Sequence, residues 1–128
     1  MENSKELLQE VFDKVVKHLK TQKVKSMKDG ICVYRTKKNC QILKCAVGCL
    51  IPKKDYSEKF EENPANDLIM VFNYKNKYIN DETIDLLIDL QDFHDNEPWT
   101  WNGELNKEIF NIFLKGIAQH YGLKYTNV

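Results

Sequence analysis

Residues 31–52 read ICVYRTKKNCQILKCAVGCLIP, and this stretch decides the fold class. Its first part, residues 31–36, is rich in β-branched and aromatic side chains, which is typical of a short strand. A polar turn follows. The run over residues 41–51 fits either the return strand of a hairpin or a short buried helix that begins near Lys44, and Pro52 ends it in both cases. Close packing is indicated by two small residues in this run, Ala46 and Gly48.

Apolar residues recur at helical spacing in three other segments, and they predict amphipathic helices over residues 4–21, 81–95 and about 104–121. The short run 68–72 favours a further helix, capped by Asn66 or Asp67. One face of the last helix is predicted to be buried, and it comprises Leu105, Ile109, Ile112, Phe113, Gly116, Ile117, His120 and Tyr121. We therefore expect an α+β fold with three or more helices packed on a small antiparallel β-hairpin, in a single domain over residues 1–128.

The nineteen basic and nineteen acidic residues cancel, but they are segregated along the chain. Residues 14–54 carry a net charge of +11, and residues 55–104 carry −10. A net charge of zero excludes attraction of the whole molecule to DNA. Two interpretations stay open. The two halves neutralise each other in the fold, or the surface is bipolar, with a basic Lys14–Lys54 face for phosphate or nucleic acid and an acidic face for a basic protein groove.

No apolar run approaches the roughly 20 residues that a membrane-spanning helix needs, and the longest is Cys45–Ile51. The first residues also lack the apolar core of a signal peptide. We therefore expect a cytoplasmic protein without a membrane partner.

Four cysteines lie close together in the sequence, at positions 32, 40, 45 and 49. Their spacing contains no Cys-x-x-Cys pair, so we expect neither a metal nor a cofactor, and a cytoplasmic location argues against disulfides. Burial as small apolar residues is one interpretation. The other is a reactive Cys45 thiolate, stabilised by Lys44 and a helix N-terminus, with His94 as its base and Asp95 or Gln91 orienting the imidazole.

Three polar residues interrupt apolar segments: Arg35 in the predicted strand, and Gln91 and His94 in the second helix. They predict a network in which Arg35 pairs with Asp95 while Gln91 and His94 bond the hairpin main chain. The alternative is a pocket in which Arg35 and His94 receive an anionic ligand such as a nucleotide. Such a pocket would have aromatic walls, for which the candidates are Tyr34, Tyr56, Trp99 and Trp101.

Two sets of residues are candidates for an interaction surface. The first is an acidic stripe on the helix over residues 81–95, formed by Asp81, Asp85, Asp89 and Asp92. The second is a loop that carries Trp99 and Trp101. Each has a structural alternative, because a solvated helix face and a cover over the core have the same sequence signature.

Several short motifs together resemble a family of known proteins. They are Cys32-x-Tyr34-Arg35, the run KCAVGxLIP over residues 44–52, Leu90-Gln91-x-x-His94-Asp95, and a closing helix that ends at Gly122-Leu123. The combination resembles small uncharacterised proteins encoded by tailed bacteriophages and prophages, over about residues 10–123. The resemblance implies a phage setting inside a host cell, and it implies no particular reaction.

Three functions follow as hypotheses. The first is a phage accessory protein that binds and modulates or inhibits a host factor, such as a defence or nucleic-acid enzyme. The second is a thiol hydrolase or transferase that uses Cys45 and His94. The third is a binder of an anionic small molecule through Arg35, although the chain has no glycine-rich phosphate loop. We favour the first, because it requires the fewest assumptions about unseen geometry.

Overall fold

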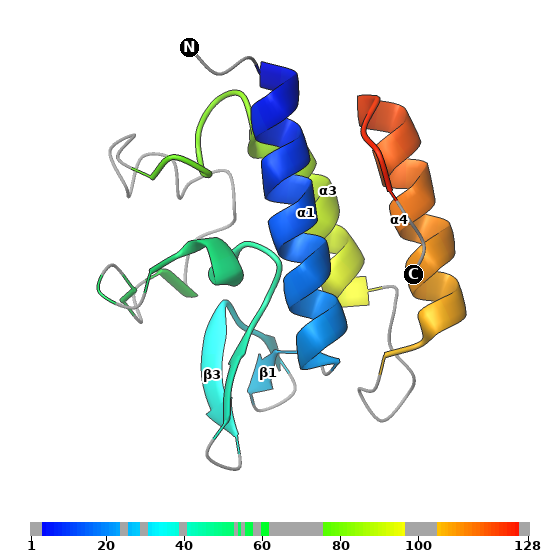
Figure 1. Cartoon of the computed structure of the whole chain (residues 1–128). Helices are drawn as coiled ribbons and strands as arrows, with labels where there is room; N and C mark the ends of the chain where they lie inside the picture. Colours follow the sequence, from blue (N-terminus) through cyan, green and yellow to red (C-terminus); the bar gives the residue numbers. More distant parts are fainter. Residues whose placement is uncertain are drawn as a thin grey trace.

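Three helices form the frame of the protein in its computed structural model (Figure 1). They are α1 (Ser4–Gln22), α3 (Ile84–Asn96) and α4 (Lys107–Tyr121). In Figure 1, α3 runs in the same direction as α1, and α4 runs in the opposite direction. The structure describes residues 4–23, 26–28, 31–38, 41–52, 54, 56–57, 60–61, 76–96 and 105–125.

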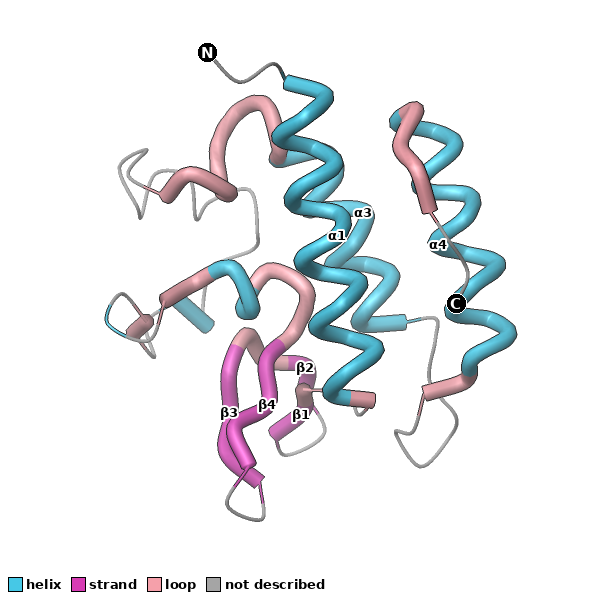
Figure 2. The backbone as a smooth tube through the Cα atoms, viewed as in Figure 1, coloured by secondary structure: helices cyan, strands magenta, loops and turns pink. Residues whose placement is uncertain are grey.

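Two small antiparallel ladders lie beside the C-terminal end of α1 (Figure 2). The first pairs β1 (Met27–Lys28) with β2 (Ile31–Cys32). The second pairs β3 (Arg35–Lys38) with β4 (Gln41–Lys44), and its register sets Arg35 opposite Lys44. The short 3-10 helix η1 (Gly48–Leu50) follows and packs on α1. The fold class is therefore α+β, as the sequence predicts.

The ambiguous run over residues 41–51 contains both of the structures that its sequence allows. Residues 41–44 form the return strand β4, and residues 48–50 form η1. The predicted strand over residues 31–36 is interrupted, because β2 ends at Cys32 and β3 begins at Arg35. The predicted helix over residues 68–72 lies outside the described residues.

The core lies where the apolar face of α1 meets α3, α4 and η1. Among its fully or almost fully buried side chains are Val11, Phe12, Val15, Leu19, Leu50, Leu86, Leu87, Leu90 and Phe110. The helices α1 and α3 therefore contribute the apolar stripes that their sequence periods predict. Within the described part of the chain, no helix has both the length and the apolar character that a membrane crossing requires.

The ends of the helices follow known capping chemistry. Asn106 precedes α4, and its side chain accepts a hydrogen bond from the Ile109 N–H at 3.2 Å. Gly122 ends α4 with a φ of 68°, and the Leu123 N–H donates to the Ala118 carbonyl at 2.7 Å. This is a Schellman motif, and the half-turn it makes directs the C-terminal segment back along the helix.

The buried face of α4 differs from the predicted one. Phe110, Leu114 and Ala118 are buried, whereas Ile112 and Phe113 are 63% and 42% exposed. Gly116 and His120, which the sequence also places inside, are exposed as well. The prediction was wrong because apolar residues occupy most of the circumference of α4, so that periodicity alone does not select the side that faces the core.

Candidate functional site

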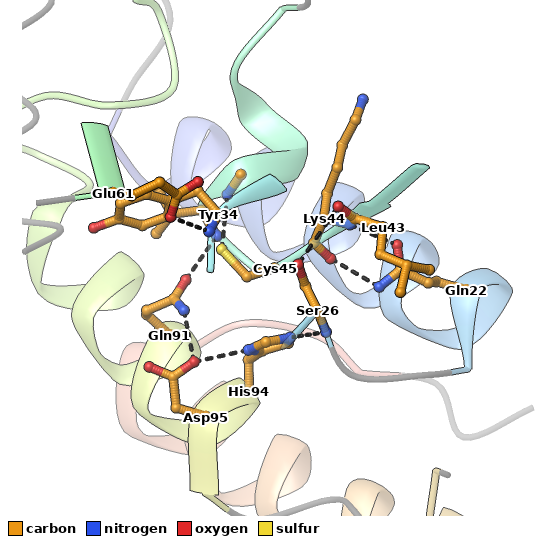
Figure 3. Close-up of polar contacts among 12 residues, drawn as sticks. Gln22, Ser26, Tyr34, Leu43, Lys44, Cys45, Glu61, Gln91, His94 and Asp95 are labelled. Carbon is orange, nitrogen blue, oxygen red and sulfur yellow. Dashed lines mark hydrogen bonds and ion pairs between the residues drawn. The ribbon is translucent and has the colours of Figure 1, made fainter. Parts of the chain in front are cut away.

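His94 is the central polar group of the site, and its side chain is completely buried in the last turns of α3. The imidazole lies between a main-chain donor and a carboxylate (Figure 3). Its Nε2 accepts a hydrogen bond from the Ser26 N–H at 3.3 Å, and its Nδ1 lies 2.8 Å from Asp95 Oδ1. Because the Ser26 N–H can only donate, Nε2 carries a lone pair and Nδ1 carries the proton. This geometry requires a neutral imidazole.

Gln91 completes the cluster one helical turn before Asp95. Its Oε1 accepts from the Val47 N–H at 3.0 Å, and its Nε2 donates to Asp95 Oδ1 at 2.8 Å. Asp95 Oδ1 thus receives hydrogen bonds from both Gln91 and His94 (Figure 3). The predicted bonds from Gln91 and His94 to the main chain are present, and they join α3 to the segments that flank the hairpins. We name Ser26, Gln91, His94 and Asp95 the α3 polar cluster.

Arg35 does not join the α3 polar cluster, and its predicted ion pair with Asp95 is wrong. Its guanidinium lies over the Tyr56 ring, 5.6 Å from the centroid, and its Nη1 is buried without a hydrogen-bond partner in the described structure. The reason is strand geometry, since successive side chains of an extended chain point to opposite faces. Tyr34 points into the core with 7% exposure, so Arg35 points away from α3.

The residues expected to wall a ligand pocket are divided between two places. Tyr34 is part of the core, and its carbonyl accepts from the Cys45 N–H at 3.1 Å. Tyr56 instead lies beside Arg35, and its hydroxyl donates to Glu61 Oε2 at 2.6 Å. Trp99 and Trp101 lie outside the described residues. The structure therefore groups Arg35 with Tyr56 and Glu61, and it groups Gln91 with His94 and Asp95.

Cys45 occupies a closed position in the core rather than a reactive one. Its side chain is fully buried, and its Sγ accepts a hydrogen bond from the Gly48 N–H at 3.2 Å. Burial raises the pKa of the Cys45 thiol well above its ordinary value. Of the two interpretations of the sequence, this direction fits burial as a small apolar residue and opposes the reactive thiolate that Lys44 and a helix N-terminus would stabilise. Desolvation is the larger effect here, and η1 is a helix of only three residues.

Cys49 has the same character as Cys45. Burial raises its pKa to about 12, and its thiol donates to the Ala46 carbonyl at 3.1 Å. Both thiols are therefore protonated near neutral pH. Among the described residues, no group of three or more His, Cys, Asp or Glu side chains is placed to hold a metal ion.

Two polar side chains that sequence reasoning missed fix the hairpin in place. Glu61 accepts from the N–H groups of Tyr34 at 2.8 Å and Arg35 at 3.2 Å. Gln22 brackets Lys44, since its Oε1 accepts from the Lys44 N–H at 2.8 Å and its Nε2 donates to the Lys44 carbonyl at 2.9 Å. Gln22 continues the apolar face of α1, three residues after Leu19 and seven after Val15, so its position carried a signal that the prediction of a helix ending at residue 21 missed. Glu61 lies in a polar segment, where the sequence carries no signal of its role.

The acidic stripe runs beside α4. Asp81, Asp85 and Asp92 are exposed, whereas Asp89 accepts a hydrogen bond from the Tyr121 hydroxyl at 2.5 Å. One turn further along α3, Phe93 contacts Phe113 of α4, with ring centroids 6.3 Å apart. Asp89 and Phe93 therefore face α4, whereas Asp81 lies in the turn that precedes α3 rather than in the helix predicted over residues 81–95. We name Asp81, Asp85, Asp89, Asp92, Ile112 and Phe113 the α3–α4 surface.

Comparison with known proteins places this chain in no family. No protein-family model, no curated protein and no solved structure matches it. The resemblance to bacteriophage proteins therefore stays a prediction, and the functional argument depends on the geometry described above.

Proposed function

We propose that this protein acts by binding a partner protein through the α3–α4 surface. The observation that carries the proposal is the exposure of Ile112 and Phe113, at 63% and 42%. Burying such a side chain at an interface contributes roughly 1.5–3 kcal/mol. Gly116 lies one turn from both residues, and a Cβ built on it meets nothing within 4 Å. Open space at this glycine lets a partner approach the helix closely.

The charge of the surface defines the chemistry of the partner. Asp85 and Asp92 are exposed on α3, and Ile112 and Phe113 are exposed on the adjoining helix α4, so the two helices offer a partner both acidic and apolar side chains. The complementary partner has an apolar pocket bordered by lysines and arginines, and salt weakens such an encounter. In the phage setting that the sequence resembles, this partner is a host protein in the cytoplasm. A basic groove of this kind is found in nucleic-acid enzymes, including those of host defence.

The test compares two exposed isoleucines that lie on different elements. Ile112→Asp places a charge on the α3–α4 surface, and Ile42→Asp places the same charge on β4, where the isoleucine is 45% exposed. The wild type and both variants are immobilised, challenged with bacterial host extract at low and high salt, and the captured proteins are quantified by mass spectrometry.

We expect a captured basic protein that is lost with Ile112→Asp, retained with Ile42→Asp, and weakened by salt. Equal loss with both variants, or no specific capture by the wild type, would overturn the proposal. Sedimentation analysis of the same proteins gives a further outcome. A wild-type dimer that Ile112→Asp converts to a monomer would assign the surface to a second copy of the chain, and this too would overturn the proposal.

A further inference from the structure

A hollow lies between α1 and the C-terminal segment, and its residues have no part in the proposed binding of a partner through α3 and α4. Its volume is about 450 Å³, which is within the range of small-molecule sites. The buried Phe12 and Val16 lie at its base beside the half-buried Tyr125, and three lysines lie around them, namely Lys17, Lys20 and Lys124. We propose that this hollow binds a nucleotide unit, either free or as part of a single strand.

A second, smaller hollow extends the first. Its volume is about 210 Å³, and Lys20 lines both. Lys20 Nζ lies 5.0 Å from the centroid of the Tyr125 ring and 6.0 Å from that of Phe110, so it stands at the junction between the two hollows. The second hollow adds two more lysines, Lys23 and Lys107. A ligand longer than one nucleotide therefore finds a continuous line of positive charge.

Among the residues that the structure describes, the lysines of the two hollows have no carboxylate partner. Within the described ranges, none of the five forms an ion pair, and the single carboxylate that lines either hollow is Asp13. An ammonium group without a counter-charge binds phosphate as a point charge. The surplus of cations is local, since the chain as a whole is neutral.

The wall of the larger hollow is held in place by specific contacts. Gln9 brackets the Lys124 main chain, donating to its carbonyl at 2.9 Å and accepting from its N–H at 2.8 Å. The Tyr125 ring packs edge-on against Phe12, with centroids 5.9 Å apart, and its hydroxyl donates to Asn111. The C-terminal segment is thus docked on α1 and α4, and the hollow exists before a ligand enters.

A nucleotide matches this lining better than an acidic peptide does. The hollow offers the half-buried Tyr125 ring, which packs against the buried Phe12, next to cations. A nucleotide carries a flat base for such surface and a phosphate for the lysines, which is the combination that single-strand binding sites use. Glutamate and aspartate side chains would satisfy the lysines but leave the apolar surface uncovered.

The test uses two variants in which an uncharged glutamine replaces a lysine of the hollow, and a matched control. Lys20→Gln and Lys124→Gln each remove one cation, and Lys115→Gln removes an exposed lysine of α4 that lines neither hollow. The probes are ATP, a fluorescent oligothymidylate of about twelve nucleotides, and polyglutamate as a polyanion without bases. Affinities are measured at several salt concentrations, and thermal melts confirm that each variant is folded.

We expect binding of ATP or the oligonucleotide, about tenfold weaker when both Lys20 and Lys124 are replaced and unchanged in Lys115→Gln, with a shallower salt dependence in the double variant. Binding of ATP with competition against the oligonucleotide identifies a free nucleotide as the ligand, and binding of the oligonucleotide alone identifies a strand. Equal binding of polyglutamate, equal loss in Lys115→Gln, or no binding of either nucleotide probe at low salt would overturn the inference. These outcomes are independent of the α3–α4 surface.

Discussion

His94 is among the largest fully buried side chains of the described core, and it is polar. A buried imidazole costs free energy unless both nitrogens have partners. Here Nδ1 meets Asp95 and Nε2 meets the Ser26 N–H, so His94 ties the end of α3 to the chain just before β1. The geometry assigns it a structural role, with no free nitrogen left for proton transfer at neutral pH.

Replacing His94 with leucine tests this role. His94→Leu leaves the Ser26 N–H without its acceptor and removes one of the hydrogen bonds that Asp95 Oδ1 accepts, and we expect the free energy of unfolding to fall by about 1–3 kcal/mol. Chemical denaturation followed by circular dichroism measures the loss. His120→Leu, at an exposed position of α4, is the control and should change stability by less than about 0.5 kcal/mol. Equal stability of His94→Leu and the wild type would contradict a structural role.

The Cys45 thiol provides a second test at the residue scale. Burial raises the pKa of the Cys45 thiol, and the Gly48 N–H donates a hydrogen bond to its Sγ. We therefore expect iodoacetamide to label Cys45 slowly near neutral pH in the folded protein and rapidly after unfolding. Peptide mass spectrometry resolves labelling at each cysteine. Rapid labelling of native Cys45 that His94→Ala suppresses would instead establish the thiol–imidazole pair of a hydrolase or transferase.

At the scale of elements, the approach of η1 to the hairpin depends on Gly48. A Cβ built on this residue would lie 1.9 Å from the Tyr34 carbonyl oxygen, which is main chain and cannot rotate away. Gly48→Ala should therefore destabilise the fold by about 1–3 kcal/mol or more. Gly116→Ala is the matched control, and we expect it to stabilise α4 by about 0.5–1 kcal/mol, because the space beside it is open.

Thermal and urea denaturation of the two alanine variants measure these effects. Opposite signs are expected, with a loss for Gly48→Ala and a gain for Gly116→Ala. A tolerated alanine at position 48 would mean that η1 does not lie against Tyr34 in solution.

The sequence predicts the elements whose pattern is local and misses the features that distant residues decide. The helix expected over residues 4–21 is observed as Ser4–Gln22, because its apolar period is regular and long. The strand over residues 31–36 is interrupted at Tyr34, where Glu61 takes two main-chain N–H groups that a ladder would otherwise use. A local sequence pattern cannot predict this interruption, because Glu61 lies 27 residues after Tyr34.

The candidate site shows the same division. Gln91 and His94 could be identified as a polar pair on an apolar helix face, and their bonds to main chain could be anticipated. The absence of an Arg35–Asp95 pair could not, because the sequence does not show which face of the strand packs on α3, and Tyr34 takes that face instead of Arg35. The exposed side of α4 could not be predicted from the sequence either. Its apolar residues occupy two faces, and tertiary packing decides which of them is buried.

At the scale of the whole molecule, the segregated charge of the sequence has two local counterparts. Five lysines line the two hollows beside α1, and Asp81, Asp85 and Asp92 are exposed on α3 and on the turn before it. The two interpretations of the sequence, a bipolar surface and mutual neutralisation, both stay predictions. In a molecule with no net charge, local groups of one sign still attract ligands of the opposite sign.

The stability of the molecule should also depend on pH through His18, which joins α1 to the hairpin. Its Nε2 lies 2.8 Å from the Lys44 carbonyl, and burial lowers its pKa from 6.5. The fold therefore favours the neutral imidazole, and protonation opposes folding as the pH falls below about 6.5. We expect the urea midpoint of the wild type to decrease from pH 7 to pH 5.

The variant His18→Gln isolates this contribution, because glutamine keeps an N–H donor for Lys44 and does not titrate. Its urea midpoint should decrease less than that of the wild type over the same interval. Parallel decreases in the two proteins would show that His18 is not responsible.

The measurement that separates binding from catalysis most directly is partner capture by two single variants. Cys45→Ala removes the thiol that accepts the Gly48 N–H in the core, and Ile112→Asp leaves that core intact while charging the α3–α4 surface. We predict that Cys45→Ala captures the same salt-sensitive host protein as the wild type and that Ile112→Asp loses it. Capture retained by Ile112→Asp and lost by Cys45→Ala would contradict a role for the protein as a binder through α3 and α4.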